Sequence, residues 1–258
     1  MPTPWNYKQK VQKLPPFLRP LAMGLRTVMM PFNVRFRKGI KIPVESEIEI
    51  KIKLTCGVQY ACEADVAGDI AEFGTASGRT ASVIASAMAR FDKFSNGPKK
   101  LHLFDSFQGL PEVESVVDSN SVHVKSSIWG KGVCNELSAA ELKELCKNYL
   151  DDERIVIYSG WFKDTLLTIP DGTKFSMVHV DCDYYQSAKE VLDHLFLNNM
   201  IQEGTAIFFD DYNCNRASPE FGERRAWSEA IKDYDVNFTD CGEYGWSCRK
   251  FIVHSYKV

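Results

Sequence analysis

Two pairs of acidic side chains occur where short apolar stretches of the sequence end. Asp181 and Asp183 follow one such stretch, and Asp210 and Asp211 follow a later one. Adjacent parallel strands lie about 4.8 Å apart, so carboxylates at their ends can converge on one ion. Oxygen ligands favour Mg²⁺, with Mn²⁺ or Ca²⁺ as substitutes. We therefore predict Asp181, Asp210 and Asp211 as metal ligands, and we expect Asp183 to point away from Asp181 if the strand continues.

These acids could instead cap the helices that follow them and interact with the helix dipoles. The metal hypothesis is favoured because buried like charges at adjacent strand ends need compensation. Cys182 and Cys214 flank the two acidic motifs. Ligation of a soft metal by these thiols is the weaker alternative, because no tetrahedral Cys/His spacing accompanies them.

A glycine-containing loop lies earlier in the chain, between an apolar stretch and an alanine-rich segment. Its residues are Glu72, Gly74, Thr75, Ala76, Ser77 and Gly78. Glycines allow close approach of the backbone to a ligand, and free N–H groups at a helix start can hold an anionic group. Asp105, followed by Ser106, ends the next apolar stretch, where an acid can accept both hydroxyls of a ribose. An Asx-turn or a helix cap is the alternative for Asp105.

The acid before the glycine loop helps to decide between two candidate nucleotide-like ligands, one with phosphate groups and one without. Glu72 would repel the pyrophosphate of NAD and attract a cationic group. S-adenosylmethionine has a ribose, an ammonium and a sulfonium but no phosphate, so it suits the pattern better. A divalent cation beside this methyl donor can lower the pKa of an acceptor hydroxyl, and Asp181 can take its proton. His123 is a further candidate base, whereas His179 alternates into its strand and is expected in the core.

The elements that must position these residues alternate between strands and helices. Strands are predicted at 68–73, 101–104, 154–158, 175–180, 205–209, 236–239 and 247–254, and helices at 80–89, 138–149, 187–197 and 224–234. This order indicates an α/β fold with a mostly parallel sheet covered by helices on both faces. Such sheets bind ligands at the carboxyl ends of their strands. Residues 45–54 alternate in polarity and predict a half-buried strand, and residues 106–135 predict a long loop.

Composition places the chain among ordinary globular proteins. Of its 258 residues 45% are hydrophobic and 25% are charged, which excludes collagen-like, disordered and coiled-coil classes. Residues 1–55 carry 11 Lys/Arg and 3 Glu, whereas the remainder carries 20 basic and 31 acidic residues. We therefore expect a basic N-terminal arm or lid at 1–55 and a catalytic domain at 56–258. The arm could pack on the body or a second subunit, or lie on a membrane surface.

Several partners and compartments are disfavoured by the same sequence. The net charge of −3 carries no general nucleic-acid signature, and no run of 18 apolar residues predicts a transmembrane segment. The N-terminus lacks the apolar core of a secretory signal. Eight cysteines without a CxxC motif predict a reducing, cytoplasmic environment.

Five motifs between about Tyr60 and Ile231 resemble the macrocin-type O-methyltransferases, which methylate sugar hydroxyls on natural products. In chain order they are GDIAEFGTASG, LFDSFQGLPE, SGWFKDTL, VHVDCDYYQS and FFDDY. The resemblance implies a Rossmann-like class I fold with a seven-stranded sheet, S-adenosylmethionine, usually Mg²⁺, and often a homo-oligomer. Cys182 stands where the family usually has glycine, and residues 112–135 match no motif of the family.

The resemblance also assigns site residues. It places the donor on Glu72–Gly78, Asp105, Ser106 and Asp181, the adenine beside Gly160, Trp161 and Phe162, and the metal on Asp181, Asp210 and Asp211. The expected function is O-methylation of a hydroxyl of a small molecule, with a sugar or other natural product as the first candidate. A catechol, another diol or an amine is an alternative acceptor, and a non-catalytic Rossmann-like binding protein is an alternative of another class.

Overall fold

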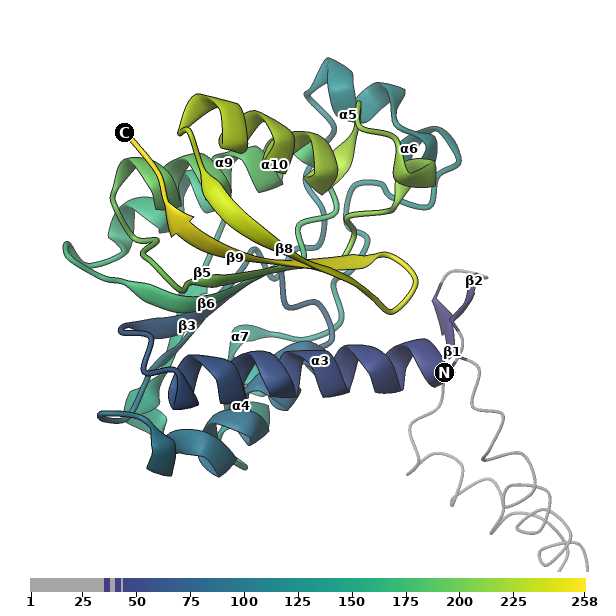
Figure 1. The fold of residues 1–258 in the computed structure, drawn as a ribbon. Helices are drawn as coiled ribbons and strands as arrows, with labels where there is room; N and C mark the ends of the chain where they lie inside the picture. The colour runs from purple at the N-terminus through teal and green to yellow at the C-terminus, as the bar shows by residue number, and fades with distance from the viewer. Residues whose placement is uncertain (1–34, 38–39, 43) are drawn as a thin grey trace, which may run out of the picture. The chain divides into compact units, whose positions relative to one another are not determined.

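The computed structural model describes residues 35–37, 40–42 and 44–258 (Figure 1). The chain forms two compact units, Met1–Glu47 and Ile48–Val258. In the first unit, strand β1 (Arg35–Arg37) pairs antiparallel with β2 (Ile40–Ile42). The expectations for the first 34 residues of the basic arm lie outside the described residues.

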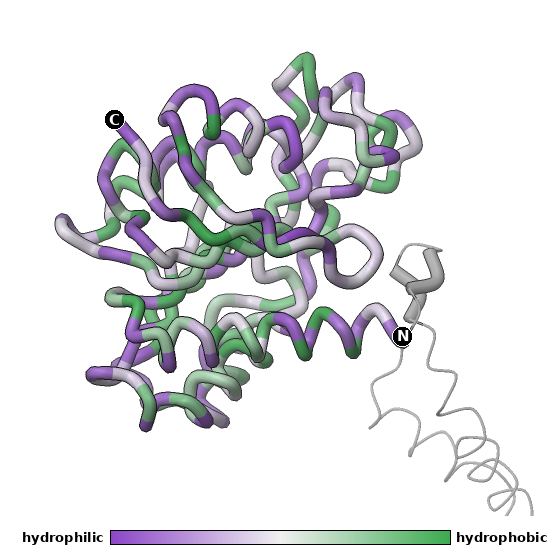
Figure 2. The backbone as a smooth tube through the Cα atoms, viewed as in Figure 1, coloured by the Kyte–Doolittle hydropathy of each residue, from purple (hydrophilic) through white to green (hydrophobic). Residues whose placement is uncertain are grey.

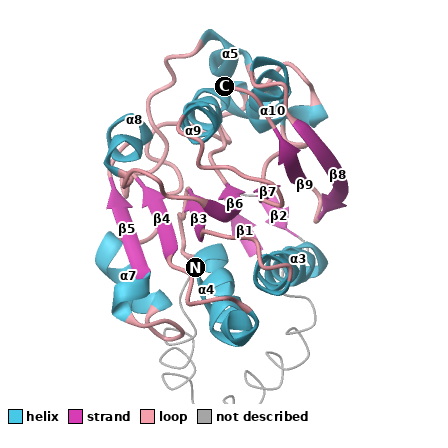
Figure 3. Ribbon diagram, turned by 60° about the vertical axis from the view of Figure 1, so that its left-hand side comes forward, coloured by secondary structure: helices cyan, strands magenta, loops and turns pink. Residues whose placement is uncertain are grey.

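The second unit is built on a seven-stranded sheet in the order β5-β4-β3-β6-β7-β9-β8 (Figure 3). The strands are β3 (Asp69–Phe73), β4 (Leu101–Asp105), β5 (Ile155–Ser159), β6 (Phe175–Val180), β7 (Ala206–Phe209), β8 (Asn237–Tyr244) and β9 (Cys248–Ser255). Strands β3 to β7 are parallel, whereas β9 runs antiparallel to both β7 and β8. The predicted fold class, a Rossmann-like and mostly parallel sheet, is confirmed.

Helices cover both faces of this sheet, and each face has its own hydrophobic core (Figures 1 and 3). One face carries α3 (Val44–Glu63), α4 (Arg79–Phe91) and α7 (Ala139–Cys146), and the other carries α8 (Phe162–Thr165), α9 (Tyr185–Leu197) and α10 (Gly222–Asp233). Short 3-10 helices lie at Asp92–Phe94, Asp152–Arg154, Leu166–Thr168 and Asn215–Ala217. Because strand side chains alternate between faces, Phe73 joins the core under α9 and α10, whereas Ile70 joins the core under α3 and α4.

The hydropathy of the chain follows these layers. Figure 2 shows hydrophobic segments along the central strands and mixed hydropathy along the helices that cover them. Within the described residues, no helix combines the length and the apolar character needed to cross a membrane. All eight cysteines are free thiols.

The prediction of a strand at 45–54 is wrong, because this segment is the first half of helix α3. Ile50 and Leu54 are buried, whereas Ile48 and Ile52 are about half exposed. The buried positions are therefore four residues apart, which is the spacing of a helix face. Alternate isoleucines satisfy the strand pattern and this helix pattern equally well, and packing on the sheet decides between them.

Residues 106–135, which we call the insert, contain two short helices rather than a continuous loop. Helix α5 spans Val116–Asn120 and α6 spans Val122–Lys125. Leu110 and Trp129 of the insert form a small hydrophobic cluster with Tyr184 and Cys214, which lie in the segments after β6 and β7. The insert is therefore packed against the same end of the sheet at which the acidic motifs lie.

Gly57 sets how closely α3 lies on the sheet. A Cβ atom at this position would lie 2.4 Å from Cζ of Phe208 and 3.2 Å from Cε of Met177. Alanine favours a helix over glycine by about 1 kcal/mol, but overpacking a core costs about 1–3 kcal/mol. The overpacking is the larger effect, because the Cβ would overlap the ring of Phe208, so we expect Gly57→Ala to lower the free energy of unfolding by about 1–2 kcal/mol in urea titrations.

Lys51→Ala, an exposed change on the same helix, is the control and should alter stability by less than about 0.5 kcal/mol. A Gly57→Ala protein as stable as the wild type would show that the helix has room to move.

Candidate functional site

Strands β3, β4 and β5 are added in one direction across the sheet, and β6 lies on the opposite side of β3, parallel to it. Ligands of such sheets bind at the switch point between these two neighbours. The glycine loop leaves β3 here and Asp181 follows β6. A Cβ on Gly74 (φ +89°) would lie only 1.9 Å from the carbonyl oxygen of Asp181, so only glycine allows this approach. The N–H of Asp181 donates to the carbonyl of Phe73 at 2.9 Å. The structure therefore brings the predicted loop and the predicted acid together.

Asp105, at the end of β4, organises the glycine loop. Its Oδ2 accepts hydrogen bonds from the backbone N–H groups of Thr75 (2.7 Å) and Ala76 (3.0 Å) and from the Thr75 hydroxyl (3.0 Å). Its Oδ1 accepts from the N–H of Phe107 at 2.7 Å. Two N–H groups of the loop are thus bonded to Asp105, whose contact with a ribose stays a prediction.

The loop after β5 joins the same edge. The N–H of Gly160 donates to the carbonyl of Asp105 at 3.0 Å. Trp161 precedes the first turn of α8, and the ring of Phe162 packs edge-on against that of Phe73 at 6.0 Å. Ser106 donates through Oγ to the carbonyl of Gly109 and shapes the start of the insert. The segments predicted to bind a methyl donor therefore end side by side.

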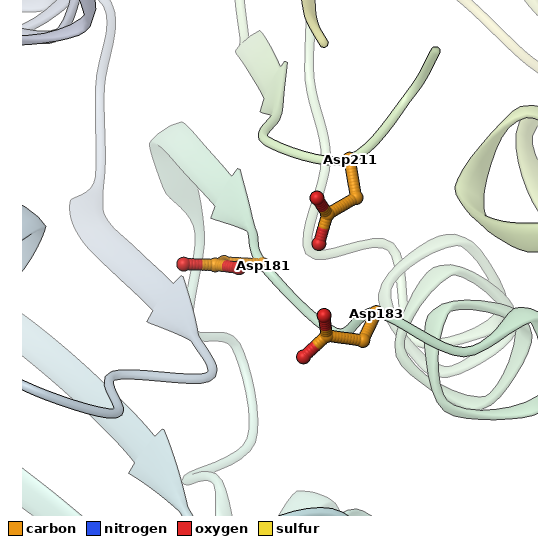
Figure 4. Close-up of side chains that lie close together, drawn as sticks. All are labelled: Asp181, Asp183 and Asp211. Atoms are coloured by element: carbon orange, nitrogen blue, oxygen red, sulfur yellow. The ribbon is translucent and has the colours of Figure 1, made fainter. Parts of the chain in front are cut away.

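Asp181, Asp183 and Asp211 form a cluster at the ends of β6 and β7 (Figure 4). One carboxylate oxygen from each lies within 4.8 Å of the others. Strand β6 ends at Val180, and Asp183 adopts a left-handed conformation with φ 59°. Because the strand does not continue, Asp183 turns toward its neighbours instead of away from Asp181. Three carboxylates at this separation are a donor set that suits a hard divalent cation.

Asp210 lies next to this cluster in the chain, but its carboxylate is directed toward His179 and Cys248. Its Oδ1 is 3.8 Å from Nε2 of His179, which is ion-pair distance, and it accepts a hydrogen bond from Cys248 Sγ at 3.3 Å. On the other side of the ring, Nδ1 of His179 lies 2.9 Å from Oε1 of Glu72. Glu72 and His179 are paired in the β3–β6 register and are fully buried. Of the predicted metal set, the structure gathers Asp181 and Asp211, while Asp210 pairs with a histidine.

The side chains of Glu72, His179 and Asp210 stabilise one another electrostatically. Burial disfavours the charged imidazole, but Asp210 and Glu72 outweigh it and raise the pKa of His179 to about 10. Burial likewise opposes ionisation of Asp210, and His179 more than compensates, so the pKa of Asp210 is lowered. His179 thus lies buried between two carboxylates that favour its charged form. Its position in the core agrees with the prediction from the strand alternation.

Glu223 is a site residue that the sequence analysis missed. This fully buried carboxylate accepts hydrogen bonds from the N–H groups of Cys182 (3.1 Å) and Asp211 (2.9 Å). It therefore ties the segment after β6 to the segment after β7. The only signal in the sequence is an acid directly before the helix predicted at 224–234, which ordinarily indicates a cap or an interaction with the helix dipole.

The remaining acids repel one another. Burial raises the pKa of Asp211 well above its usual range, and the carboxylates of Asp183 and Glu223 raise it further. Burial and the charge of Asp181 do the same to the pKa of Glu223. A bound cation would relieve both effects, so the electrostatics and the oxygen donors fit a divalent metal.

His123 lies in α6, attached to the segment after β7. Its backbone N–H donates to Oδ1 of Asn215 at 2.9 Å, and its Nδ1 lies 3.0 Å from the N–H of Asn215. The ring stacks on Trp129 with centroids 4.5 Å apart. His123 is outside the group of carboxylates that the described residues form around Asp181. Its role as a base stays a prediction.

The fold and the relatives of the chain identify its class. In overall structure it is similar to the O-methyltransferase NovP, with a TM-score of 0.65, 22% identity, and coverage of 80% of this chain and 79% of the other. Residues 52–239 match the macrocin O-methyltransferase (TylF) family. The chain therefore belongs to the macrocin O-methyltransferase family, and it is an O-methyltransferase.

Two curated relatives cover about three quarters of the chain. One is the 8-demethyl-8-(2,3-dimethoxy-alpha-L-rhamnosyl)-tetracenomycin-C 4′-O-methyltransferase of Streptomyces olivaceus, 27% identical over 204 residues, 75% of this chain and 74% of that protein. The other is the mycinamicin III 3″-O-methyltransferase of Micromonospora griseorubida, 25% identical over 205 residues, 76% of this chain and 78% of that protein.

The opposite pKa shifts of Asp210 and Asp211 predict opposite effects of two equivalent substitutions in metal-free protein. Asp210→Asn removes the partner of a buried imidazolium and should cost about 2–4 kcal/mol of unfolding free energy. Asp211→Asn removes a repelled carboxylate and should add about 1 kcal/mol at pH 8. Urea unfolding in the presence of EDTA measures both.

The pH dependence of the Asp211→Asn effect has a defined sign. An acid whose pKa rises on folding destabilises the folded state increasingly as the pH rises from its unfolded value, 3.8, through the raised value. The gain from Asp211→Asn should therefore be smaller at pH 5 than at pH 8. Equal changes in stability for the two variants at pH 8 would contradict the electrostatic description.

Proposed function

We propose that the protein transfers a methyl group from S-adenosylmethionine to a hydroxyl of a sugar or other natural product, with a divalent cation, Mg²⁺ by preference, at the acid cluster. The convergence of Asp181, Asp183 and Asp211 beside the glycine loop carries this proposal. The names of both relatives describe O-methylation, of a rhamnosyl-tetracenomycin in one and of mycinamicin III in the other. These names support a sugar hydroxyl as the acceptor.

The donor is proposed to lie on the loops after β3, β4 and β5, with its methionine part toward Glu72. Glu72 is fully buried, and its Oε2 has no hydrogen-bond partner within the described structure, while its Oε1 contacts His179. A buried carboxylate oxygen without a partner is costly and suits a cationic ligand group such as an ammonium. The proposed contacts are Glu72, Gly74, Thr75, Ala76, Ser77, Gly78, Asp105, Ser106, Gly160, Trp161, Phe162 and Asp181. When bound, S-adenosylmethionine supplies a methyl group activated on a sulfonium.

The cation is proposed to bind Asp181 and Asp211, which belong to both the predicted set and the observed cluster. Asp183 is the third ligand favoured by the geometry, and Asp210 is the third ligand favoured by the resemblance. When bound, the cation lowers the pKa of a nearby hydroxyl. Asp181 is the proposed acceptor of the hydroxyl proton, and Glu223 keeps the two acidic segments in register by holding their backbone N–H groups.

Assembly as a homo-oligomer, residence in the cytoplasm and a role of the basic arm as a lid stay predictions of the sequence. None of them is needed for the chemistry proposed here. The boundary between arm and catalytic domain near residue 55 is likewise a prediction of the sequence.

Binding of the product S-adenosylhomocysteine tests the donor site directly. We expect isothermal titration calorimetry to detect binding to the wild-type protein with and without Mg²⁺, because no metal ligand other than Asp181 is proposed to touch the donor. Asp211→Asn should retain this binding within about threefold and lose turnover by about 100-fold or more, as expected for loss of a metal that stabilises the transition state. No binding under either condition would overturn the proposed function.

The third metal ligand is identified by a matched pair of variants, Asp183→Asn and Asp210→Asn. Because Asp183 lies in the cluster and Asp210 faces His179, we expect Asp183→Asn to weaken Mn²⁺ binding by about tenfold or more and Asp210→Asn to weaken it less. Electron paramagnetic resonance of free Mn²⁺ measures both affinities. The reverse order would show that Asp210 leaves His179 when the cation binds.

A further inference from the structure

Helix α9 begins directly after the acid cluster, yet its own N-cap residue supplies no side-chain hydrogen bond. Tyr184 is at the N-cap and Tyr185 is the first helical residue. The first N–H groups of a helix lack partners inside the helix and need acceptors from elsewhere. Asp118 of the insert provides them, because its Oδ1 accepts from the N–H of Tyr185 at 2.8 Å and its Oδ2 from the N–H of Gln186 at 3.1 Å.

This cap is long-range and buried. Asp118 lies 67 residues before Tyr185 in the chain, and only 3% of its surface is exposed. Its own helix, α5, is capped by Ser115, whose Oγ accepts from the N–H of Val117 at 3.1 Å. The hydrophobic cluster around Trp129 holds the insert further. Asp118 is therefore held in place by the insert and in turn holds the first turn of α9.

The position of α9 decides the orientation of Asp183. Only four residues separate Val180, the last residue of β6, from Tyr185. Within this short connection Asp183 adopts its left-handed conformation, and the N–H of Tyr184 donates to the carbonyl of Cys182 at 2.6 Å. A non-glycine residue holds such a conformation only where its surroundings enforce it. A shift of the first turn of α9 would let the connection relax and rotate the Asp183 carboxylate.

We propose that Asp118 is a positioning residue for the acid cluster: by capping α9 from the insert, it keeps the carboxylate of Asp183 facing Asp181 and Asp211. It does not touch the cluster and acts through the backbone of Tyr185 and Gln186. The inference rests on the proposed function, because the property that Asp118 controls is the affinity of the cluster for a divalent cation. It also gives the insert a role in the metal site, besides any contact with the acceptor.

The test compares two variants that each lose one helix cap. Asp118→Ala removes the cap of α9. Ser138→Ala removes the cap of α7, where Ser138 Oγ accepts from the N–H of Glu141 at 3.3 Å in a capping box, and α7 packs on the opposite face of the sheet from α9. The Kd for Mn²⁺ is measured by electron paramagnetic resonance, and unfolding is followed in parallel by circular dichroism. We expect Asp118→Ala to raise this Kd on the order of tenfold and Ser138→Ala to leave it unchanged.

Asp118→Asn separates positioning from charge and remains informative if the alanine variant does not fold. The amide loses the negative charge but keeps one oxygen that can accept from Tyr185, so we expect a Kd between those of the wild type and Asp118→Ala. Affinity for S-adenosylhomocysteine should stay within about twofold of wild type in all three variants, since none of them alters a proposed donor contact.

Three results would overturn the inference. An unchanged Mn²⁺ affinity in Asp118→Ala, with a loss of stability like that of Ser138→Ala, would make Asp118 a structural cap alone. Equal weakening in the asparagine and alanine variants would assign the effect to charge. Wild-type protein that binds no Mn²⁺ would overturn the metal proposal and this inference together. If the wild type binds Mn²⁺ and Asp118→Ala binds it with the same affinity, only the inference about Asp118 is overturned.

Discussion

Mutual repulsion of carboxylates at one edge of the sheet is the constraint on which the rest of the site depends. The acids gathered there are Glu72, Asp181, Asp183, Asp210, Asp211 and Glu223, and most of them are largely buried. Each charge taken out of water needs a partner. Glu72 and Asp210 share the buried imidazole of His179, and Glu223 accepts two backbone N–H groups. Burial and the neighbouring carboxylates raise the pKa of Asp211, and a divalent cation held by the cluster of three would offset both effects.

The parallel sheet makes this arrangement possible because it delivers every strand end to the same edge. At the switch point between β3 and β6, the glycine loop approaches the backbone of Asp181 more closely than any side chain would permit. Asp105 and Glu223 have analogous tasks on the two sides of this point. Asp105 accepts the N–H groups of the glycine loop, and Glu223 accepts those of the two acidic segments. Carboxylates that accept backbone N–H groups hold loops in fixed conformations, so both sides of the site are preorganised.

The insert contacts both segments that carry the acid cluster, and differences in substrate binding are expected in the insert itself. It reaches the segment after β6 through Asp118 and the segment after β7 through His123 and Asn215. These two attachments place residues from the part of the insert that resembles no family motif, 112–135, in direct contact with segments that carry such motifs. In this arrangement, sequence changes in the insert can shift the acid cluster, because the insert holds the backbone segments that carry its carboxylates.

The sequence by itself determined the class of fold, the order of the strands along the chain, and the edge at which Glu72, Asp105, Asp181 and Asp211 would meet. Periodicity and strand-end residues carry this information because they are local. The tertiary structure decided the rest: that residues 45–54 are helical, that Asp183 joins the cluster while Asp210 faces His179, and that Glu223 and Asp118 hold the acidic segments. Each of these outcomes depends on contacts between residues distant in the chain or on a single backbone turn. Alternating polarity cannot distinguish a strand from one face of a helix, and spacing does not show which N–H group a buried carboxylate will accept.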